Sequence, residues 1–245
     1  MLFLLPPSES KAVGGNPLSI DMVALTFGGM QPARDALYAK LVKFSKSKAG
    51  KEKFTKAQIE LNLNLQSAPT LPAIDRYVGT LFDALQGRGL KGTPTEHNTL
   101  SKDERERAKE SLFIQSALFG LIPASNLIPN YRFSATTKIP GVDLKKHWAE
   151  AHNVIWKRLE GQQIIDLRSK QYAELAPVPE TFDCLTVEVY DIESGKAMNH
   201  FNKKAKGQFV RAYLQGADTL PEMAKAAKLK MELDGNSLRL FTNQR

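Results

Sequence analysis

The spacing of apolar residues predicts one buried strand followed by a series of amphipathic helices. Residues 2–5 form a short continuous apolar run that ends at two prolines, which is typical of a buried strand. Apolar residues then recur at steps of three and four over residues 32–44, 72–85, 101–119 and 143–159. This period places them on one helical face, so each segment is predicted to be a helix that packs on a core.

Beyond Gly161 the pattern changes to short runs rich in β-branched residues, which predict strands. These runs are residues 164–167, 185–190, 197–201, 229–233 and 238–241. Asp234-Gly235-Asn236 predicts a hairpin turn between the last two, and a short helix is expected after Gly207. Since no linker or repeat interrupts the pattern, we expect one α+β unit over residues 1–245. It would be helix-rich in its first two-thirds, with a mixed sheet completed by C-terminal strands.

Composition narrows the class of protein. The chain has 245 residues, of which 42% are hydrophobic and 24% charged, as in ordinary globular proteins rather than disordered or fibrous ones. A single cysteine excludes an internal disulfide and fits a reducing compartment. The apolar N-terminal run lacks the basic residues and the length of a signal peptide, and no stretch approaches a membrane span. We expect a cytoplasmic protein with no membrane association and no obligate protein partner.

Charge is concentrated in two segments of a chain whose net charge is +8. Lys40–Lys56 holds seven lysines and one acid, and Lys196–Arg245 holds ten basic residues and four acids. The rest of the chain is therefore net acidic. Such clustering favours an anionic partner. For Lys40–Lys56 two interpretations stay open, a solvated lysine-rich surface and a non-specific contribution to nucleic-acid binding.

The basic run Lys203–Arg211 lies between a predicted strand and a predicted helix. Gly207 would let the backbone approach a ligand closely, and amides at a helix N-terminus favour anions. Basic side chains would supply the positive charge for phosphate binding; they are Lys203, Lys204, Lys206 and Arg211. The alternative is an ordinary charged turn at the surface.

A second candidate site follows the first strand. If Ser8-Glu9-Ser10-Lys11 lay near Tyr131-Arg132, the two segments would form a polar cluster capable of anion binding or of chemistry. Glu9 would then be a general acid or base. The candidate pocket residues for such an enzyme are Glu9, Lys11, Tyr131, Arg132 and Tyr172.

The glycine pattern at residues 87–92 and the spacing of the histidines bear on whether the protein binds a cofactor or a metal. Gly87–Gly92 matches G-x-G-x-x-G, but the dinucleotide fingerprint needs a strand before it and a helix after it, whereas a helix precedes it here. A helix-hairpin-helix turn and a simple helix stop are the better alternatives. The four histidines and single cysteine lack metal-ligand spacing, so we expect no metal and no cofactor.

Six segments, taken in order along the chain, resemble the YaaA peroxide-stress family. They are similar to its LLPPSEGK opening, its Y-x-G-x-x-Y-x-A-L helix, its LYGLLRP and I-x-x-YR blocks, its S-x-x-Y motif and its YAKKARG motif. The matching residues are 4–11, 76–85, 118–122, 128–132, 165–172 and 201–211. Departures fall at Lys206, which replaces a motif arginine, and at three other positions, Pro123, Asn126 and Gln171.

The resemblance implies a compact α+β protein with a positively charged cleft and a helix-hairpin-helix element. It also implies a role in hydrogen-peroxide stress, in limiting free iron and in binding or protecting DNA. Residues at the family's polar and basic motif positions are Lys11, Tyr131, Arg132, Lys203, Lys204, Lys206 and Arg211. We therefore predict sequence-independent DNA binding through phosphate contacts. The alternative is an enzyme acting in the same cleft on a phosphate- or carboxylate-bearing small molecule or a nucleic-acid base.

Overall fold

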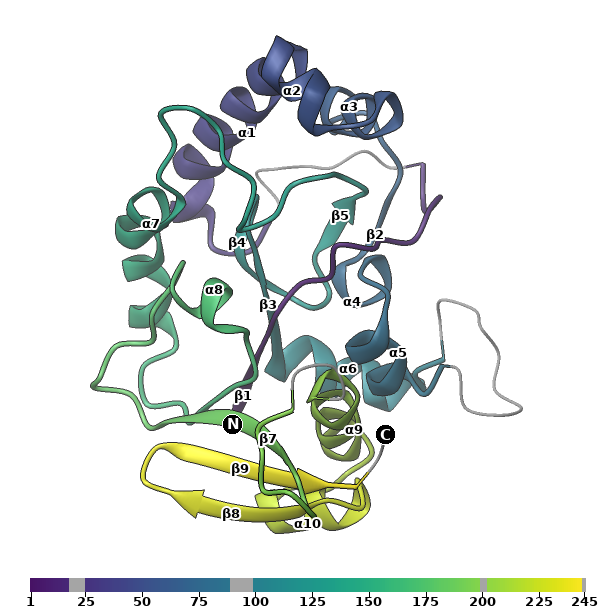
Figure 1. The fold of residues 1–245 in the computed structure, drawn as a ribbon, viewed down its shortest axis with the longest axis vertical. Helices are drawn as coiled ribbons and strands as arrows, with labels where there is room; N and C mark the ends of the chain where they lie inside the picture. The colour runs from purple at the N-terminus through teal and green to yellow at the C-terminus, as the bar shows by residue number, and fades with distance from the viewer. Residues whose placement is uncertain (18–24, 89–98, 199–201, 244–245) are drawn as a thin grey trace.

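A seven-stranded sheet forms the centre of the computed structural model, which describes residues 1–17, 25–88, 99–198 and 202–243 (Figure 1). The strand order is β4-β3-β1-β6-β7-β9-β8. The strands are β1 (Leu2–Leu5), β3 (Leu112–Ser116), β4 (Gly120–Pro123), β6 (Ile164–Asp166), β7 (Cys184–Asp191), β8 (Lys230–Asp234) and β9 (Ser237–Thr242). The inner strands pair in parallel, while β4 and β8 add antiparallel edges. The α+β fold class is therefore confirmed, with a sheet that is mostly parallel.

The strand β1 lies in the middle of this sheet, between β3 and β6. All four of its residues are buried, because a parallel strand inside a sheet is covered on both faces. This burial accounts for the continuous apolar run at residues 2–5. The polar segment that follows Leu5 therefore starts at the carboxyl end of the central strand.

Helices pack around the sheet and extend beyond it at one end. They are η1 (Gly28–Met30), α1 (Gln31–Lys46), α2 (Lys48–Lys53), α3 (Lys56–Leu63), α4 (Ala73–Arg76), α5 (Thr80–Gln86), α6 (Lys102–Ser111), α7 (Leu144–Arg158), α8 (Lys170–Ala173), α9 (Asn202–Leu214) and α10 (Leu220–Ala226). A small second sheet pairs β2 (Thr70–Pro72) with β5 (Leu127–Pro129). The helices α1, α2 and α3 carry the lysines of segment 40–56 and lie together at the top of Figure 1.

Two helix predictions were wrong. The segment 101–119 is helical only as far as Ser111, and its apolar continuation is the buried strand β3. A short apolar run fits a buried helix and a buried strand equally well, so periodicity could not separate them. The segment 72–85 is broken between α4 and α5, where Gly79 has a φ of 116° that interrupts the helix.

Other local predictions are confirmed by the hydrogen bonds. Ser101 and Glu104 form the capping box that begins α6, and the Asp143 side chain accepts from two amides at the start of α7. The terminal hairpin pairs β8 with β9 across the predicted turn. The predicted strand 197–201 lies partly outside the described residues; Ala197 forms an isolated bridge with Tyr190.

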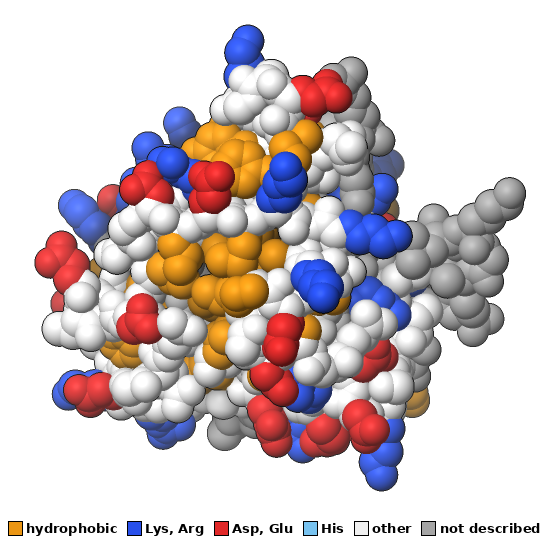
Figure 2. All heavy atoms as spheres, turned by 90° about the horizontal axis from the view of Figure 1, so that it is seen from below, with side chains coloured by type: hydrophobic (Ala, Val, Ile, Leu, Met, Phe, Trp, Pro, Cys, Tyr) orange, Lys and Arg blue, Asp and Glu red, His pale blue; other side chains and the backbone are white. Residues whose placement is uncertain are grey.

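The foot of the molecule in Figure 1 is formed by β7, β8, β9 and α10. Seen from this side, hydrophobic side chains gather in the middle of the surface and charged side chains surround them (Figure 2). Two large hydrophobic residues of this part of the chain, Ile192 and Leu233, are exposed. None of the described helices is both long and apolar enough to cross a membrane.

Candidate functional site

The strand order reverses between β1 and β6. After β1 the chain builds β3 and β4 on one side, and it then returns to build β6, β7 and β9 on the other. Ligands of open parallel sheets bind outside the carboxyl ends of the strands at such a switch point. Residues 6–10 follow β1 and residues 167–172 follow β6, and members of both segments line one cleft of about 620 Å³. This volume lies in the range of small-molecule sites, about 300–1,000 Å³.

Three further segments complete the switch-point cleft. They are the start of α5 with the preceding Gly79, the loop 134–136, and Asn202, Lys203 and Lys206 on α9. At Gly79 the φ of +116° favours glycine, and an added Cβ would stand 3.4 Å from the Ser8 hydroxyl. The positive φ, more than the space, therefore requires glycine where α5 begins beside the turn that follows β1.

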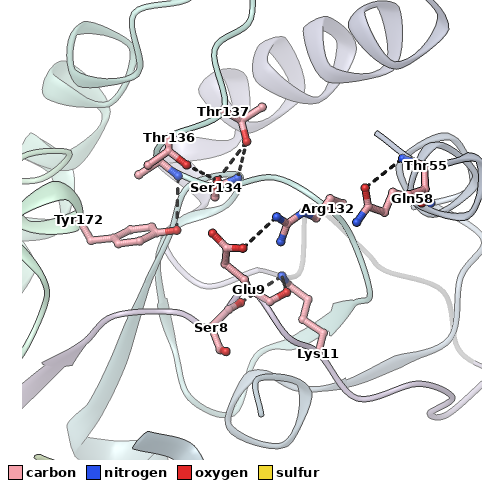
Figure 3. A network of polar contacts seen from close by, with 11 residues as sticks. Ser8, Glu9, Lys11, Thr55, Gln58, Arg132, Ser134, Thr136, Thr137 and Tyr172 are labelled. Carbon is pink, nitrogen blue, oxygen red and sulfur yellow. Dashed lines mark hydrogen bonds and ion pairs between the residues drawn. The ribbon is translucent and has the colours of Figure 1, made fainter. Parts of the chain in front are cut away.

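The expected approach of Glu9 to Arg132 is found. Arg132 Nη2 lies 2.9 Å from Glu9 Oε2, and in Figure 3 the carboxylate points between Arg132 and Tyr172. The Arg132 backbone is held by Asn62, whose Oδ1 accepts from the Arg132 amide at 2.8 Å and whose Nδ2 donates to the Arg132 carbonyl at 3.0 Å. Because Glu9 is largely exposed, solvent screens the pair, which orients the carboxylate more than it stabilises the fold.

Lys11 supports the turn that carries Glu9. Its Nζ donates to the carbonyls of Ser8 at 3.2 Å and Glu9 at 3.4 Å, and stands 4.2 Å from the centre of the Tyr131 ring. Burial lowers the pKa of Lys11 to about 7, and the nearby positive charge of Arg132 acts in the same direction. Lys11 is not among the residues that line the switch-point cleft, so it acts behind the cleft wall.

The two candidate tyrosines lie in different surroundings. Tyr131 is buried, and its hydroxyl is hydrogen-bonded to the hydroxyls of Tyr77 at 2.7 Å and Ser116 at 2.8 Å. The prediction that Tyr131 lines a pocket was therefore wrong, because the β-sheet core encloses it. Tyr172 does line the cleft, where its hydroxyl accepts from the Ala135 amide at 3.4 Å. Burial raises the pKa of Tyr172, and the Glu9 carboxylate adds to that rise.

The basic run 203–211 is arranged differently from the prediction. It lies inside α9, which begins at Asn202, so Gly207 is in the helix interior. A Cβ at Gly207 would stand 2.3 Å from the Leu81 carbonyl oxygen. The predicted amide site at Gly207 was wrong, since this glycine lets α9 pack closely against α5 and does not face a ligand.

Helical periodicity divides the basic side chains of α9 between two faces. Lys203 and Lys206 line the switch-point cleft, whereas Lys204 and Arg211 line a separate pocket. Lys206 is buried and its Nζ donates to the Leu167 carbonyl at 3.1 Å. Desolvation lowers the pKa of Lys206 to about 8, although Asp166 and Glu188 oppose this shift. We expected this run to form one phosphate-binding surface. The structure instead divides its basic side chains between two cationic surfaces.

A buried ion pair that sequence reasoning missed fixes the segment after β6. Arg168 Nη2 lies 2.7 Å from Asp166 Oδ2, and its Nη1 donates to the Ala176 carbonyl at 2.9 Å. Both charged side chains are buried. An Asp-x-Arg sequence directly after an apolar strand was the available signal. The pair holds residues 167–172 in the conformation that forms one wall of the cleft.

Two remaining predictions can be compared with the structure only in part, because some of their residues lie outside the described ranges. Gly87 ends α5 with a φ of 71°, which confirms the helix stop, but residues 89–92 of the G-x-G-x-x-G motif lie outside the described part of the chain. The helix-hairpin-helix element stays a prediction. Within the described ranges, no three His, Cys, Asp or Glu side chains form a group suited to a metal ion.

Together these features define an α+β protein with a polar cleft at the switch point of its sheet. The sequence matches the family described as "Peroxide stress protein YaaA" over residues 1–232, and the chain belongs to this family. It is 33% identical over 257 residues to a UPF0246 protein of Corynebacterium glutamicum (strain R), covering 99% of each chain. It is also 32% identical over 233 residues to a UPF0246 protein of Streptomyces coelicolor, covering 91% of this chain and 85% of that one.

Proposed function

We propose that this peroxide-stress family member is a cytoplasmic protein that binds DNA, with the switch-point cleft receiving one nucleotide. The observation that supports this most is the position of cationic side chains in a cleft of nucleotide size at the carboxyl ends of β1 and β6. Lys203 and Lys206 line this cleft, and Arg132 lies at it through its contact with Glu9. These side chains would contact phosphate, which positions a strand without reading its sequence.

The size of the cleft bears on the form of DNA. About 620 Å³ is within the range of small-molecule sites, so the cleft would admit a single nucleotide but not a stacked duplex. A nucleotide enters such a pocket from a single strand or after leaving the base stack, and unstacking is least costly where pairing is already lost. We therefore expect single-stranded or damaged DNA to bind more tightly than an intact duplex.

Charge outside the cleft would aid this binding. The net charge is +8, and the lysines of α1, α2 and α3 form a positively charged end of the molecule. Such a surface raises the association rate with a polyanion and weakens with salt. The role in limiting free iron that the resemblance implies would then be indirect. It would follow from DNA binding, not from coordination of iron by the described residues.

The test is fluorescence anisotropy with labelled single-stranded and duplex oligonucleotides at several salt concentrations. Lys203→Ala should weaken binding and reduce the slope of log K against log salt by about 0.7–0.9, as expected for one lost phosphate contact. Lys157→Ala, at an exposed position of α7 outside the cleft lining, is the matched control for loss of one lysine charge. If the two variants behave alike, the switch-point cleft is not where DNA binds.

The Glu9–Arg132 pair favours a second candidate, an enzyme that acts on a phosphate- or carboxylate-bearing small molecule or on a nucleic-acid base. Arg132 orients the Glu9 carboxylate in the cleft, within the same cluster as Tyr172 (Figure 3). A carboxylate oriented in this way serves as a general base. In this case Glu9→Gln would keep ligand binding and abolish turnover of a nucleotide substrate. Turnover that survives this change would exclude Glu9 as the base.

A further inference from the structure

A second cationic pocket lies on a different face of α9 from the switch-point cleft. It has a volume of about 420 Å³ and is formed by α5, α9 and the end of α10. The helix α9 contacts both α5 and α10, and α10 lies at the bottom of the molecule in Figure 1. Only Thr80, at the start of α5, is shared with the lining of the switch-point cleft. We call this site the α9–α10 pocket.

Basic side chains dominate the lining of the α9–α10 pocket. Four of them come from three separate segments and one carboxylate, Asp83, stands against them; the four are Arg88, Lys204, Arg211 and Lys228. Arg88 Nε lies 3.1 Å from Asp83 Oδ1, which offsets one positive charge. An excess of positive charge remains around a concave space, and this arrangement favours an anion.

Arg211 is held in place by the turn after α5. Its Nη1 donates to the Leu85 carbonyl at 3.1 Å, and its Nη2 lies 4.0 Å from a Glu104 carboxylate oxygen. A Cβ at Gly87 would come within 2.8 Å of the guanidinium carbon, and Gly87 has a φ of +71°. The absence of a side chain at Gly87 therefore lets the guanidinium lie close to this turn, where it forms part of the pocket wall.

Two lysines at the pocket differ from these arginines because no ion-pair partner for either exists among the described residues. Lys204 is half-buried on α9, and Lys228 follows α10 with a positive φ of 57° that fixes the backbone in the left-handed region. Each ammonium group is a point charge with three donors and no acceptor. Lysines placed on two sides of one concave space are suited to the oxygens of a single phosphate group.

We infer that the α9–α10 pocket binds a small phosphate monoester. Lys204 and Lys228, the two basic side chains with no ion-pair partner among the described residues, match a ligand that carries two negative charges on one group, and about 420 Å³ leaves room for a modest organic part beside the phosphate. This site is separate from the switch-point cleft proposed for DNA. Lys203 and Lys206 line the cleft, whereas Lys204 and Arg211 line this pocket. One helix thus presents two anion sites.

The experiment is calorimetric titration of the whole chain with inorganic phosphate at low ionic strength. Lys204→Ala and Lys228→Ala should each weaken phosphate binding by about tenfold, the size expected for one lost charge-assisted hydrogen bond. Lys225→Ala, at an exposed position of α10 that lines neither the pocket nor the switch-point cleft, is the matched control and should keep this binding. Both pocket lysines are at or near the surface, so the variants should fold.

Two outcomes would overturn the inference. One is the absence of phosphate binding at millimolar concentration, and the other is binding that Lys203→Ala removes while Lys204→Ala and Lys228→Ala leave it intact. A second titration identifies the kind of molecule that carries the phosphate. It compares the affinity for a small sugar phosphate with the affinity for a 5′-phosphorylated oligonucleotide. Tighter binding of the oligonucleotide, lost in the pocket variants, would replace the small ligand with a strand end. The DNA-binding measurement with Lys203→Ala tests the switch-point cleft alone. A negative result there would not contradict phosphate binding in the α9–α10 pocket.

Discussion

The Arg132 guanidinium lies 2.9 Å from the Glu9 carboxylate, although 123 positions separate the two residues in the chain. Glu9 follows the central strand β1, and Arg132 lies shortly after β5. Their contact closes one side of the switch-point cleft and fixes the direction of a carboxylate that would otherwise rotate in solvent. It also places a negative charge beside the cations that we propose as phosphate contacts.

Removing that negative charge should therefore strengthen DNA binding. Glu9→Gln keeps the shape of the side chain, releases Arg132 from its ion pair and takes away a repulsive charge. We expect about a two- to fivefold tighter complex at low salt, with the gain fading as salt rises. Anisotropy titrations of the variant and the wild type at several salt concentrations measure it. Weaker binding would mean that Glu9 itself contacts the ligand.

The pKa of Lys206 predicts how stability changes in alkaline solution. Burial lowers this pKa from 10.5 to about 8, so between these values the unfolded chain holds more protons on this amine than the folded chain does. Stability from this group therefore rises as pH increases from about 8 to 10.5 and is lost as pH falls through the folded pKa. Relative to Lys206→Met, the wild type should gain stability across this window.

Chemical denaturation at a series of pH values checks the Lys206 prediction. Lys203→Met is the matched control, because Lys203 is exposed on the same helix. The stability difference between wild type and Lys203→Met should stay nearly constant with pH. A flat difference for Lys206→Met as well would show that Lys206 keeps an ordinary pKa in the folded protein.

Cys184 should be a poor peroxide sensor despite the family's link to peroxide stress. Burial raises the pKa of this thiol to about 11, and the Asp166 carboxylate adds to the rise. Only about one thiol in ten thousand is then ionised at neutral pH, and the thiolate is the reactive form. Labelling with iodoacetamide, followed by mass spectrometry, should be far slower than for glutathione. Rapid labelling of the folded protein would contradict this expectation.

Gly207→Ala should destabilise the protein although alanine is the better helix former. The new Cβ would meet the Leu81 carbonyl oxygen at 2.3 Å and the Ala84 Cβ at 2.8 Å, which forces α5 and α9 apart. We expect a loss of about 1–3 kcal/mol in the free energy of unfolding, larger than the gain of up to about 1 kcal/mol in helix propensity.

The control for Gly207→Ala is Gly28→Ala, where an added Cβ has no atom within 4 Å and φ is not positive. Its free energy of unfolding, from urea titration, should stay within about 0.5 kcal/mol of the wild type. A neutral Gly207→Ala would show that the contact between α5 and α9 adjusts at little cost.

Local signals in the sequence predicted the elements that depend on local chemistry. The hairpin turn after Asp234, the capping box at Ser101 and the cap at Asp143 all occur as expected, because each rests on contacts within a few residues. The strand β3 was not separable from the helix before it, because burial on both faces removes the alternation that identifies a strand.

The site was predictable as a set of residues but not as an arrangement. The sequence suggested a polar cluster only on the condition that residues 8–11 lie near Tyr131-Arg132, and the structure shows the contact between Glu9 and Arg132. The division of the basic run between two pockets depends on α9 beginning at Asn202, and the interpretation of Gly207 depends on its contact with α5. Both are tertiary facts, set by packing between segments that are distant in sequence.

The central position of β1 has a consequence for how the protein is made. Residues 2–5 leave the ribosome before their two neighbours in the sheet, which begin only at Leu112 and Ile164. The strand β1 can pair with β3 once Leu112–Ser116 have been synthesised, but its second neighbour is missing until β6 follows, so the sheet closes late and slowly. The cleft walls at residues 6–10 and 167–172 then meet in the same late step, and a nascent chain released before β6 would carry no binding site at all.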